Sequence, residues 1–217
     1  MDKKVTVVLT SCGRHDLLEK TLDSFFKFNT HPIESFIVIE DGPMPPIYLA
    51  EKFQKTFPEI LFLCTGEKKG QVNAIDSAYS FVNTEYIFHL EDDWEFYKPG
   101  FIEQSMELLE EFPKIICVWI RSIADTNGHP LVPGGNHANF KLLSTKYHWK
   151  GFTWNPGLRR LADYKAIGTY GAHVKWDPKK PWLAEQQIGI LYWQMGFHAA
   201  ILKNGFVRHI GGGRHVK

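Results

Sequence analysis

The sequence predicts an α/β fold built on a mostly parallel, twisted sheet with helices on both of its faces. Short apolar runs rich in β-branched residues alternate with amphipathic segments through the front half of the 217-residue chain. Strands of a parallel sheet are buried on both faces, so they are continuously apolar, and helices connect them. Three of the runs end in polar clusters, as expected where the carboxyl ends of strands form a binding edge.

The expected strands and helices of the front half follow each other in order. A helix is expected after the first strand, with Leu18 and Leu22 on its apolar face and Asp16 in a capping box with Glu19. A short helix before Pro58 and a helix that begins at Gly70 separate the next strands, and Pro99 begins a fourth helix. The five strands are expected at residues 5–10, 36–39, 60–63, 86–90 and 115–120.

The back half is less regular. Residues 124–140 form a long expected loop rich in Gly, Pro, Asn and His. Helices are expected near residues 158–167 and 181–195, and Asn204-Gly205 is a turn signal between two apolar runs. The change in pattern predicts two halves of one domain rather than two independent domains.

Composition and charge exclude several classes. The net charge of +1 gives no general attraction to nucleic acid or to an anionic membrane. The three cysteines show no pairing or zinc spacing, which favours buried thiols in a reducing compartment. No stretch approaches the roughly 20 apolar residues that span a bilayer. We expect a soluble cytoplasmic protein whose contact with a membrane, where it occurs, is peripheral.

The acidic triplet Glu91-Asp92-Asp93 is the strongest chemical signal. It directly follows a buried strand, and neighbouring carboxylates raise each other's pKa unless a cation is present. Such oxygen ligands suit Mg²⁺ or Mn²⁺, which would bridge a diphosphate and neutralise charge on a leaving group. The alternative is a solvated acidic loop. The strand in front of the triplet favours a metal site.

Two other strand ends carry groups suited to a nucleotide. Thr10, Ser11 and Gly13 let backbone N–H groups approach a base or a phosphate, and Arg14 can bind a phosphate through two N–H groups. The pattern matches neither the dinucleotide-binding loop nor the Walker loop. Asp41 ends the second strand, where it suits a ribose or a base, the alternative being an Asp that forms a turn before glycine.

In combination, these motifs resemble the glycosyltransferases of family 2, which have the GT-A fold. The resemblance implies a metal-dependent inverting enzyme of the hexosyltransferase type, which moves a sugar from a nucleotide diphosphate, by default UDP, to a hydroxyl of a glycan. Residues 1–93 would bind the nucleotide sugar and residues 94–217 the acceptor. The segments that carry the resemblance are 5–14, 40–42, 70–79, 86–94, 155–168 and 182–197.

The resemblance also implies a base. Glu185 would take the proton of the acceptor hydroxyl, near the start of the helix that usually begins with a Glu-Asp pair in this family. Here the pair is Glu185-Gln186, so the assignment depends on one carboxylate. Asp163 and Asp177 are the alternatives.

Metal and nucleotide-sugar ligands follow from the same resemblance. Asp93 would hold Mn²⁺ or Mg²⁺, and a late histidine, His209, would join it. Because the triplet is Glu-Asp-Asp rather than the commoner Asp-x-Asp, the ligand stays open between Asp92 and Asp93. The residues expected to contact the nucleotide sugar are Thr10, Ser11, Arg14, Asp41, Gln71, Asp76 and Asp92.

Four further residues are expected near the acceptor or the phosphates. Arg214 and His215 would close over the phosphates as a lid, the alternative being a disordered terminus. Trp154 and Trp182 lie beside motifs and are candidates for stacking on sugar rings, with core packing as the alternative.

Two other functions are compatible with parts of the sequence. A nucleotidyltransferase that makes nucleotide sugars shares the α/β sheet and the acidic metal site, but it usually has a Gly-rich basic loop after the first strand, of which only Gly13-Arg14 is present. A non-catalytic carbohydrate-binding module would account for the aromatic content of 14%, but such modules are usually all-β. We therefore expect glycosyl transfer from a nucleotide sugar to a glycan.

Overall fold

The computed structural model describes residues 3–133, 137–175, 177, 180 and 182–214. Its main sheet has five strands in the order β3-β2-β1-β4-β8. The first three neighbouring pairs are parallel, and β8 is antiparallel to β4. The strands are β1 (Val5–Ser11), β2 (Ser35–Glu40), β3 (Ile60–Cys64), β4 (Tyr86–Glu91) and β8 (Gly157–Arg160).

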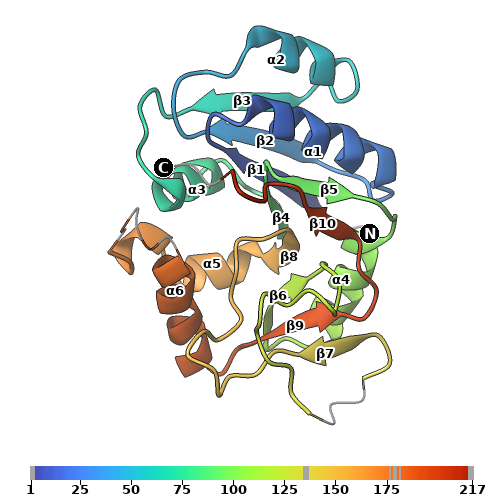
Figure 1. Ribbon diagram of the computed structural model, residues 1–217, viewed down its shortest axis with the longest axis vertical. Helices are drawn as coiled ribbons and strands as arrows, with labels where there is room; N and C mark the ends of the chain where they lie inside the picture. Colours follow the sequence, from blue (N-terminus) through green and yellow to red (C-terminus); the bar gives the residue numbers. More distant parts are fainter. Residues whose placement is uncertain (1–2, 134–136, 176, 178–179, 181, 215–217) are drawn as a thin grey trace.

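Helices cover both faces of the sheet, as predicted (Figure 1). One core lies under α1, α2 and α4, and a second core lies under α3, α5 and α6. The bounds of these helices are α1 (His15–Phe28), α2 (Ile47–Gln54), α3 (Gln71–Tyr79), α4 (Phe101–Glu111), α5 (Leu161–Ile167) and α6 (Trp182–Gln194).

The alternation of side chains along each strand explains why the strands are apolar throughout. In β1, Val7 and Leu9 point into the first core, whereas Val8 points into the second. In β2, Val38 belongs to the first core and Ile39 to the second. Successive strand residues face opposite sides of a sheet, so a strand between two helical layers needs apolar residues at every position.

The back half adds two smaller sheets. β5 (Trp94–Phe96) pairs antiparallel with β10 (Val207–His209). A three-stranded sheet has the order β6-β9-β7, with β6 at Ile115–Trp119, β7 at Phe140–Leu142 and β9 at His198–Leu202. The short helix η1 (Tyr170–Ala172) precedes α6.

Two expectations about residues 115–167 were wrong in detail. The strand expected at 115–120 is not hydrogen-bonded into the main sheet, because β8 occupies the place beside β4. The helix expected from residue 158 begins at Leu161, because residues 157–160 form β8. Gly157 permits this arrangement, since a Cβ there would collide with the carbonyl oxygen of Val118 in β6.

Two local signals have a different structural setting from a simple turn or cap. Asn204-Gly205 lies between β9 and β10, which are not paired because they belong to different sheets. A Cβ at position 205 would lie 2.9 Å from Ser122 Cα, so the glycine serves a close backbone approach. Asp16 does not cap α1, which has Arg14 at its N-cap and no side-chain cap hydrogen bond.

Within the described residues, the helices are too short or too polar to cross a membrane.

Candidate active site

The parallel register brings the polar strand ends together at one edge of the sheet. Ser11 at the end of β1 lies opposite Glu40 of β2, and Thr10 lies opposite Glu91 of β4. The loop after β1 and the turn after β4 are therefore neighbours, as expected at the carboxyl edge of a parallel sheet.

Arg14 pairs with two carboxylates of the acidic triplet. Its guanidinium forms an ion pair with Asp92, and its Nη1 lies 2.6 Å from Asp93 Oδ2. Ser11 Oγ and the backbone N–H of Cys12 donate to Asp92 Oδ2 over 3.2 and 3.3 Å. Asp92 is only 1% exposed. The loop after β1 therefore neutralises the acids that follow β4.

His209 reaches the same acids from the other end of the chain. The antiparallel pairing of β10 with β5 places His209 opposite Trp94, and His209 Nε2 lies 3.2 Å from Asp93 Oδ2. The chain then continues against Asp93, because the N–H of Ile210 donates to the Asp93 carbonyl oxygen. The β10 segment thus contributes one side of the site.

Only glycine fits at position 211, directly after Ile210. A Cβ on Gly211 would lie 2.8 Å from Asp93 Cβ and 2.9 Å from Asp93 Cγ, whereas a Cβ on Gly212 would meet nothing within 4 Å. We expect Gly211→Ala to lower the free energy of unfolding by about 1–3 kcal/mol, as overpacking does, and Gly212→Ala to leave it nearly unchanged. Urea unfolding of the two variants checks this, and equal stabilities would contradict the close contact.

The two aspartates of the site have pKa values shifted in opposite directions. Burial raises the pKa of Asp92 to about 6, despite the neighbouring Arg14. Burial also raises the pKa of Asp93, but hydrogen bonds and positive charges from His209 and Arg14 outweigh this effect and lower it below its ordinary value. Asp93 is therefore the carboxylate held in its ionised form, which is the form that binds a cation.

Glu91 completes the triplet on its other side. Its Oε1 accepts a hydrogen bond of 2.7 Å from Gln71 Nε2 at the start of α3. Burial, together with the charges of Asp93, Glu185 and Asp92, raises the pKa of Glu91 to about 8. A carboxyl that keeps its proton at neutral pH avoids part of the repulsion within the triplet.

This pKa predicts a pH-dependent stability. The folded value of about 8 exceeds the ordinary 4.5, so the stability that Glu91 contributes is complete below pH 4.5 and is lost as the pH rises through 8. Glu91→Gln cannot ionise. We expect its free energy of unfolding, relative to the wild type, to increase by on the order of 1–3 kcal/mol between about pH 5 and pH 9.

Urea unfolding across this pH range is the measurement. Glu85→Gln is the matched control, because Glu85 is exposed at the other end of β4 beside Lys3. If the difference in free energy of unfolding between Glu91→Gln and the wild type is the same at every pH, Glu91 is not protonated in the folded protein.

Glu185 approaches the triplet from α6. Thr153 Oγ1 and the backbone N–H of Trp154 donate to its Oε1 over 2.8 and 2.7 Å. Its other oxygen, Oε2, accepts no hydrogen bond from any described residue. Burial raises the pKa of Glu185, although these two hydrogen bonds oppose the shift. The charge of Glu185 acts on Glu91, so the two halves of the chain meet at these carboxylates.

Asp41 organises the loop in front of α3. Its Oδ1 accepts from the N–H of Lys69 over 2.7 Å, and its Oδ2 accepts from the N–H of Gly70 over 2.9 Å. Thr65 Oγ1 also lies 3.3 Å from Oδ1. Both oxygens are thus engaged within the protein, so Asp41 shapes the loop beside the expected nucleotide site.

Asp76 does not meet the other predicted residues. Its carboxylate accepts hydrogen bonds from the Tyr164 hydroxyl and from the N–H groups of Tyr170 and Gly171, over 2.8–2.9 Å. It therefore fastens η1 to α3. The predicted contact of Asp76 with a nucleotide sugar would require these three bonds to be replaced.

The two tryptophans differ in their surroundings. Trp154 is 1% exposed and packs edge-on against Phe152 and Tyr170, so its ring is part of the core and is not free to stack on a sugar. Trp182 is 59% exposed at the start of α6 and remains the candidate for stacking.

Arg214 holds the last described segment across the site. Its guanidinium pairs with both oxygens of Asp16 over 2.7 and 2.8 Å, and its carbonyl oxygen lies 3.4 Å from Arg14 Nη1. The segment therefore crosses the start of α1, next to the predicted phosphate-binding residues. His215, the other predicted lid residue, lies outside the described residues.

Three functional neighbours were not assigned from the sequence. Glu40 is buried and accepts a hydrogen bond from the backbone N–H of Gly13. In the sequence, only its position at the end of a strand indicated that it belongs to the site. Thr153 holds Glu185, and Asp16 holds Arg214. No local pattern distinguishes either of them, because their partners lie far away in the sequence.

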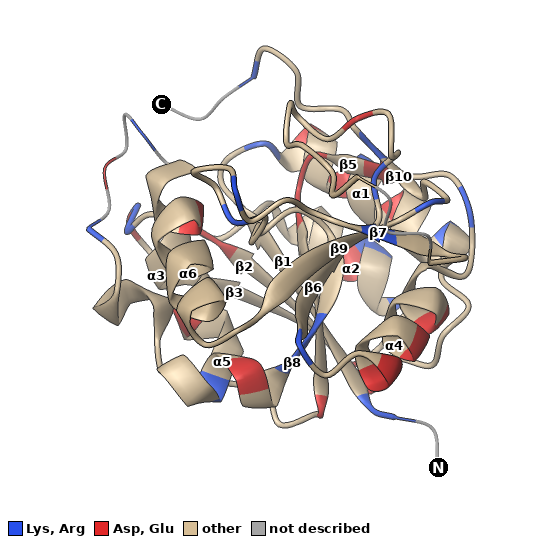
Figure 2. Ribbon diagram, turned by 90° about the horizontal axis from the view of Figure 1, so that it is seen from below, with Lys and Arg blue, Asp and Glu red and all other residues tan. Residues whose placement is uncertain are grey.

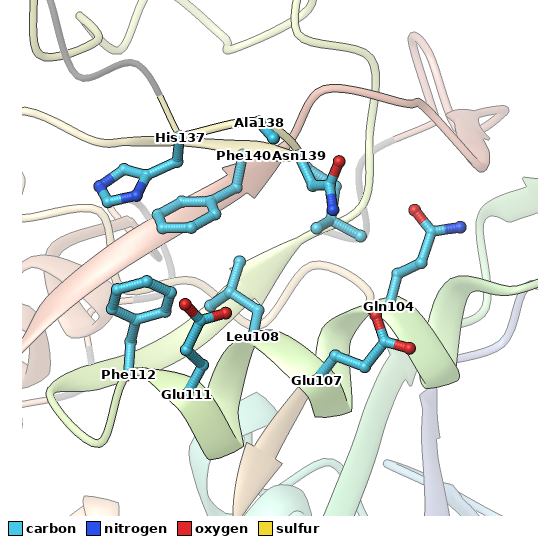
Figure 3. A pocket seen from close by; sticks show the side chains of 10 residues that line it. Gln104, Glu107, Leu108, Glu111, Phe112, His137, Ala138, Asn139 and Phe140 are labelled. Carbon is cyan, nitrogen blue, oxygen red and sulfur yellow. The ribbon is translucent and has the colours of Figure 1, made fainter.

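A cavity elsewhere in the molecule does not belong to this site. A cavity of about 170 Å³ lies between α4 and residues 137–140 (Figure 3), and α4 carries a run of acidic positions (Figure 2). None of the predicted site residues lines it; its lining includes Glu107, Glu111, Phe112, His137 and Phe140. The carboxyl edge of the sheet is the candidate site because of its chemistry.

A divalent cation would find two protein ligands at this edge. Among the described residues, no group of three or more His, Cys, Asp or Glu side chains is arranged to hold a metal ion. Asp93 and His209 converge to 3.2 Å. Magnesium-type sites often use one or two protein ligands and complete the shell with substrate phosphates and water, and the pair fits such a shared site.

The comparisons with known proteins agree with the fold. The family model described as glycosyl transferase family 2 matches residues 6–169. The mannosyltransferase PcManGT from Pyrobaculum calidifontis, in complex with GDP-Man and Mn²⁺, is 13% identical with a TM-score of 0.66, and the match covers 92% of this chain and 54% of that one. S. aureus TarS 1-349 in complex with UDP is 11% identical with a TM-score of 0.68, over 94% and 59%.

The chain belongs to glycosyl transferase family 2, because the family model covers most of its length. The predicted family and the predicted GT-A fold are both confirmed. The chain spans little more than half the length of the solved structures it matches. No curated protein sequence matches it significantly.

Proposed function

We propose that the chain is a metal-dependent inverting glycosyltransferase that moves a sugar from a nucleotide diphosphate to a hydroxyl of a glycan. One observation carries the proposal: Glu185, whose Oε2 accepts no hydrogen bond from any described residue, lies near enough to act on Glu91, in the triplet that pairs with Arg14 at the carboxyl edge of the sheet. A base on one side and a diphosphate site on the other are what an in-line displacement requires.

On the donor side, Arg14 is the residue that responds to a diphosphate. It now forms ion pairs with Asp92 and Asp93, and its guanidinium is suited to phosphate oxygens. Arg14 would turn from the aspartates toward the diphosphate, while Ser11 and the N–H of Cys12 keep Asp92 in place. The negative charge of the acids is then available to a cation.

Asp93 and His209 are the residues that would hold this cation, Mn²⁺ or Mg²⁺. When bound, it would neutralise the charge that develops on the leaving diphosphate. The neighbouring structures support this assignment, since one contains GDP-Man with Mn²⁺ and another contains UDP. UDP is the donor nucleotide that we propose.

On the acceptor side, Glu185 is the proposed base. Its Oε2 would take the proton of the acceptor hydroxyl as that oxygen forms a bond to the anomeric carbon. The bond from this carbon to the diphosphate oxygen breaks at the same time, and its electron pair leaves with the nucleotide. Attack from the face opposite the nucleotide inverts the anomeric centre. The raised pKa of Glu185 brings this base closer to neutral pH.

The proposal also covers the organisation of the chain, its location and the contacts around the site. The division into a donor half at 1–93 and an acceptor half at 94–217 stays a prediction, as does a cytoplasmic location. Trp182 is the exposed ring at the start of α6 and is the candidate for contact with the glycan. Thr10 near the end of β1, Gln71 at the start of α3 and Asp41 after β2 are the residues proposed to contact the nucleotide.

The test is a thermal-shift experiment with UDP and GDP, each with Mn²⁺, with Mg²⁺ or with a chelator. A ligand at about 100 times its Kd stabilises by about 2.7 kcal/mol. We expect one nucleotide to shift the melting temperature only with metal, and Asp93→Ala to abolish the shift. Glu95→Gln, a carboxylate paired with Arg208 at the surface, is the control. The absence of any shift from every nucleotide with metal would contradict the proposal.

A further inference from the structure

Arg159 is a buried cation that forms no ion pair with any carboxylate of the described residues. It lies on β8, is 2% exposed, and has its guanidinium 5.4 Å from the centre of the Phe152 ring. Its Nε and Nη1 also donate to no acceptor among the described residues. A buried unpaired charge is costly to a fold, so its presence calls for a physical reason.

A short chain of hydrogen bonds leads from Arg159 to the proposed base. Arg159 Nη2 donates to the carbonyl oxygen of Thr153 over 3.0 Å, and Thr153 Oγ1 donates to Glu185 Oε1 over 2.8 Å. The next residue, Trp154, donates its N–H to the same oxygen. Arg159 thus fixes the backbone of the two residues that bind one oxygen of Glu185 and leave the other free.

The charge of Arg159 also acts on Glu185. The charged and titratable groups that face Glu185 are Arg159 and Arg121, which favour its ionised form, and Glu91 and Cys117. In the buried surroundings of α6 the negative form of Glu185 is disfavoured. A fixed positive charge nearby offsets part of this effect, and it does so more strongly than it would in water.

We propose that Arg159 is a positioning residue for the base: through Thr153 it holds Glu185 in the orientation that presents a free oxygen, and it favours the ionised form of that carboxylate. The inference rests on the proposed function, since it assumes that Glu185 takes the proton. Arg159 itself lies in the core and does not contact the substrate. Its role resembles that of a side chain which orients a catalytic group from behind.

The adjacent Arg160 provides a matched control. It lies on the same strand, opposite Tyr86 at the far end of β4, and its guanidinium bonds to the Ile115 carbonyl oxygen and pairs with Asp163. Arg160→Met removes the same charge with the same substitution and also disturbs packing, but it does so on the opposite face of the sheet, beside α4.

The first measurement is an NMR titration of the Glu185 carboxyl carbon, which requires no turnover. We expect Arg159→Met to raise the pKa of Glu185 by about one unit, the effect of a unit charge roughly 12 Å away at an effective dielectric constant of about 20. Arg159→Lys keeps the charge and should leave the pKa close to wild type. Arg160→Met should leave it unchanged. An equal pKa in Arg159→Met and Arg160→Met would overturn the proposal.

The second measurement tests the link from Arg159 to Glu185 through Thr153. It remains informative if Arg159→Met fails to fold. Thr153→Val removes the hydroxyl that binds Glu185, and Thr153→Ser restores it. We expect the acidic limb of the pH profile of kcat to move to higher pH in Thr153→Val and to return in Thr153→Ser. If the acidic limb of the pH profile stays at the same pH in Thr153→Val, Thr153 does not link Arg159 to Glu185.

The two measurements separate the inference from the function on which it rests. A Glu185 pKa that moves in Arg159→Met while Glu185→Gln retains full turnover would remove the base role and, with it, the positioning role. A Glu185 pKa that does not move would remove the role of Arg159 alone, whatever the turnover.

Discussion

Glu185→Gln is expected to lower kcat by about 10²–10⁴-fold, the range that a general base contributes. The substitution changes little else. A glutamine oxygen can still accept the hydrogen bonds that Thr153 and the N–H of Trp154 make to Glu185 Oε1. What is lost is the ability of the second oxygen to take a proton from the acceptor. Donor binding should therefore stay within about twofold of wild type.

Steady-state kinetics and donor titration measure the two effects. Asp163→Asn is the control among the alternative bases, because Asp163 pairs with Arg160 beyond the amino end of β4, away from the triplet. We expect this variant to keep nearly full turnover. A Glu185→Gln enzyme with wild-type kcat and intact donor binding would exclude Glu185 as the base.

The pH profile provides a second signature of the same residue. Because burial raises the pKa of Glu185 above its ordinary 4.5, a larger fraction of the enzyme is protonated and inactive in mildly acidic solution. Turnover should rise with pH through this raised value. The rise should be absent from the residual activity of Glu185→Gln.

Asp93→Ala is expected to lower kcat/KM by about 10²–10³-fold, in line with the loss of one electrostatic stabiliser of a transition state. Asp93 is the acid held in its ionised form by His209 and Arg14, so its removal deletes the main ligand of the proposed cation. Asp92 still pairs with Arg14 in the variant, and the loop after β1 should keep its place.

Removal of the cation with a chelator should reproduce this loss in the wild type. Activity of the wild type should return when Mn²⁺ is added, whereas Asp93→Ala should respond weakly to the same addition. Glu95→Gln, which removes a carboxylate two residues along β5, should keep both activity and metal response, because exposed ion pairs contribute about 0–1 kcal/mol. Equal stimulation of Asp93→Ala and wild type by Mn²⁺ would remove Asp93 as a ligand.

The sequence predicted the parts of this site that depend on local pattern. The apolar runs of β1, β2 and β4 identify buried strands, and the topology of parallel sheets then places Ser11, Glu40 and Glu91 at one edge. The family resemblance added Glu185 and His209, which lie near the triplet in the structure. Their catalytic and metal roles remain predictions.

Other parts depend on partners that a local pattern does not specify. Nothing in the spacing of Asp41 or Asp76 indicates that backbone N–H groups occupy their oxygens. The antiparallel insertion of β8 was missed because a strand of four residues carries little periodic signal. Gly211 belongs to a run of three glycines in which no pattern distinguishes one position from another, and the structure shows it against Asp93.

The pairing of β10 with β5 has a consequence for how the molecule folds. His209 and Asp93 are 116 residues apart in the chain, and contacts between distant residues carry a large entropy of loop closure and form slowly. The strands of the front half can associate earlier, through shorter connections. The proposed cation site should therefore be among the last regions to become ordered during refolding, and a slow kinetic phase should accompany its appearance.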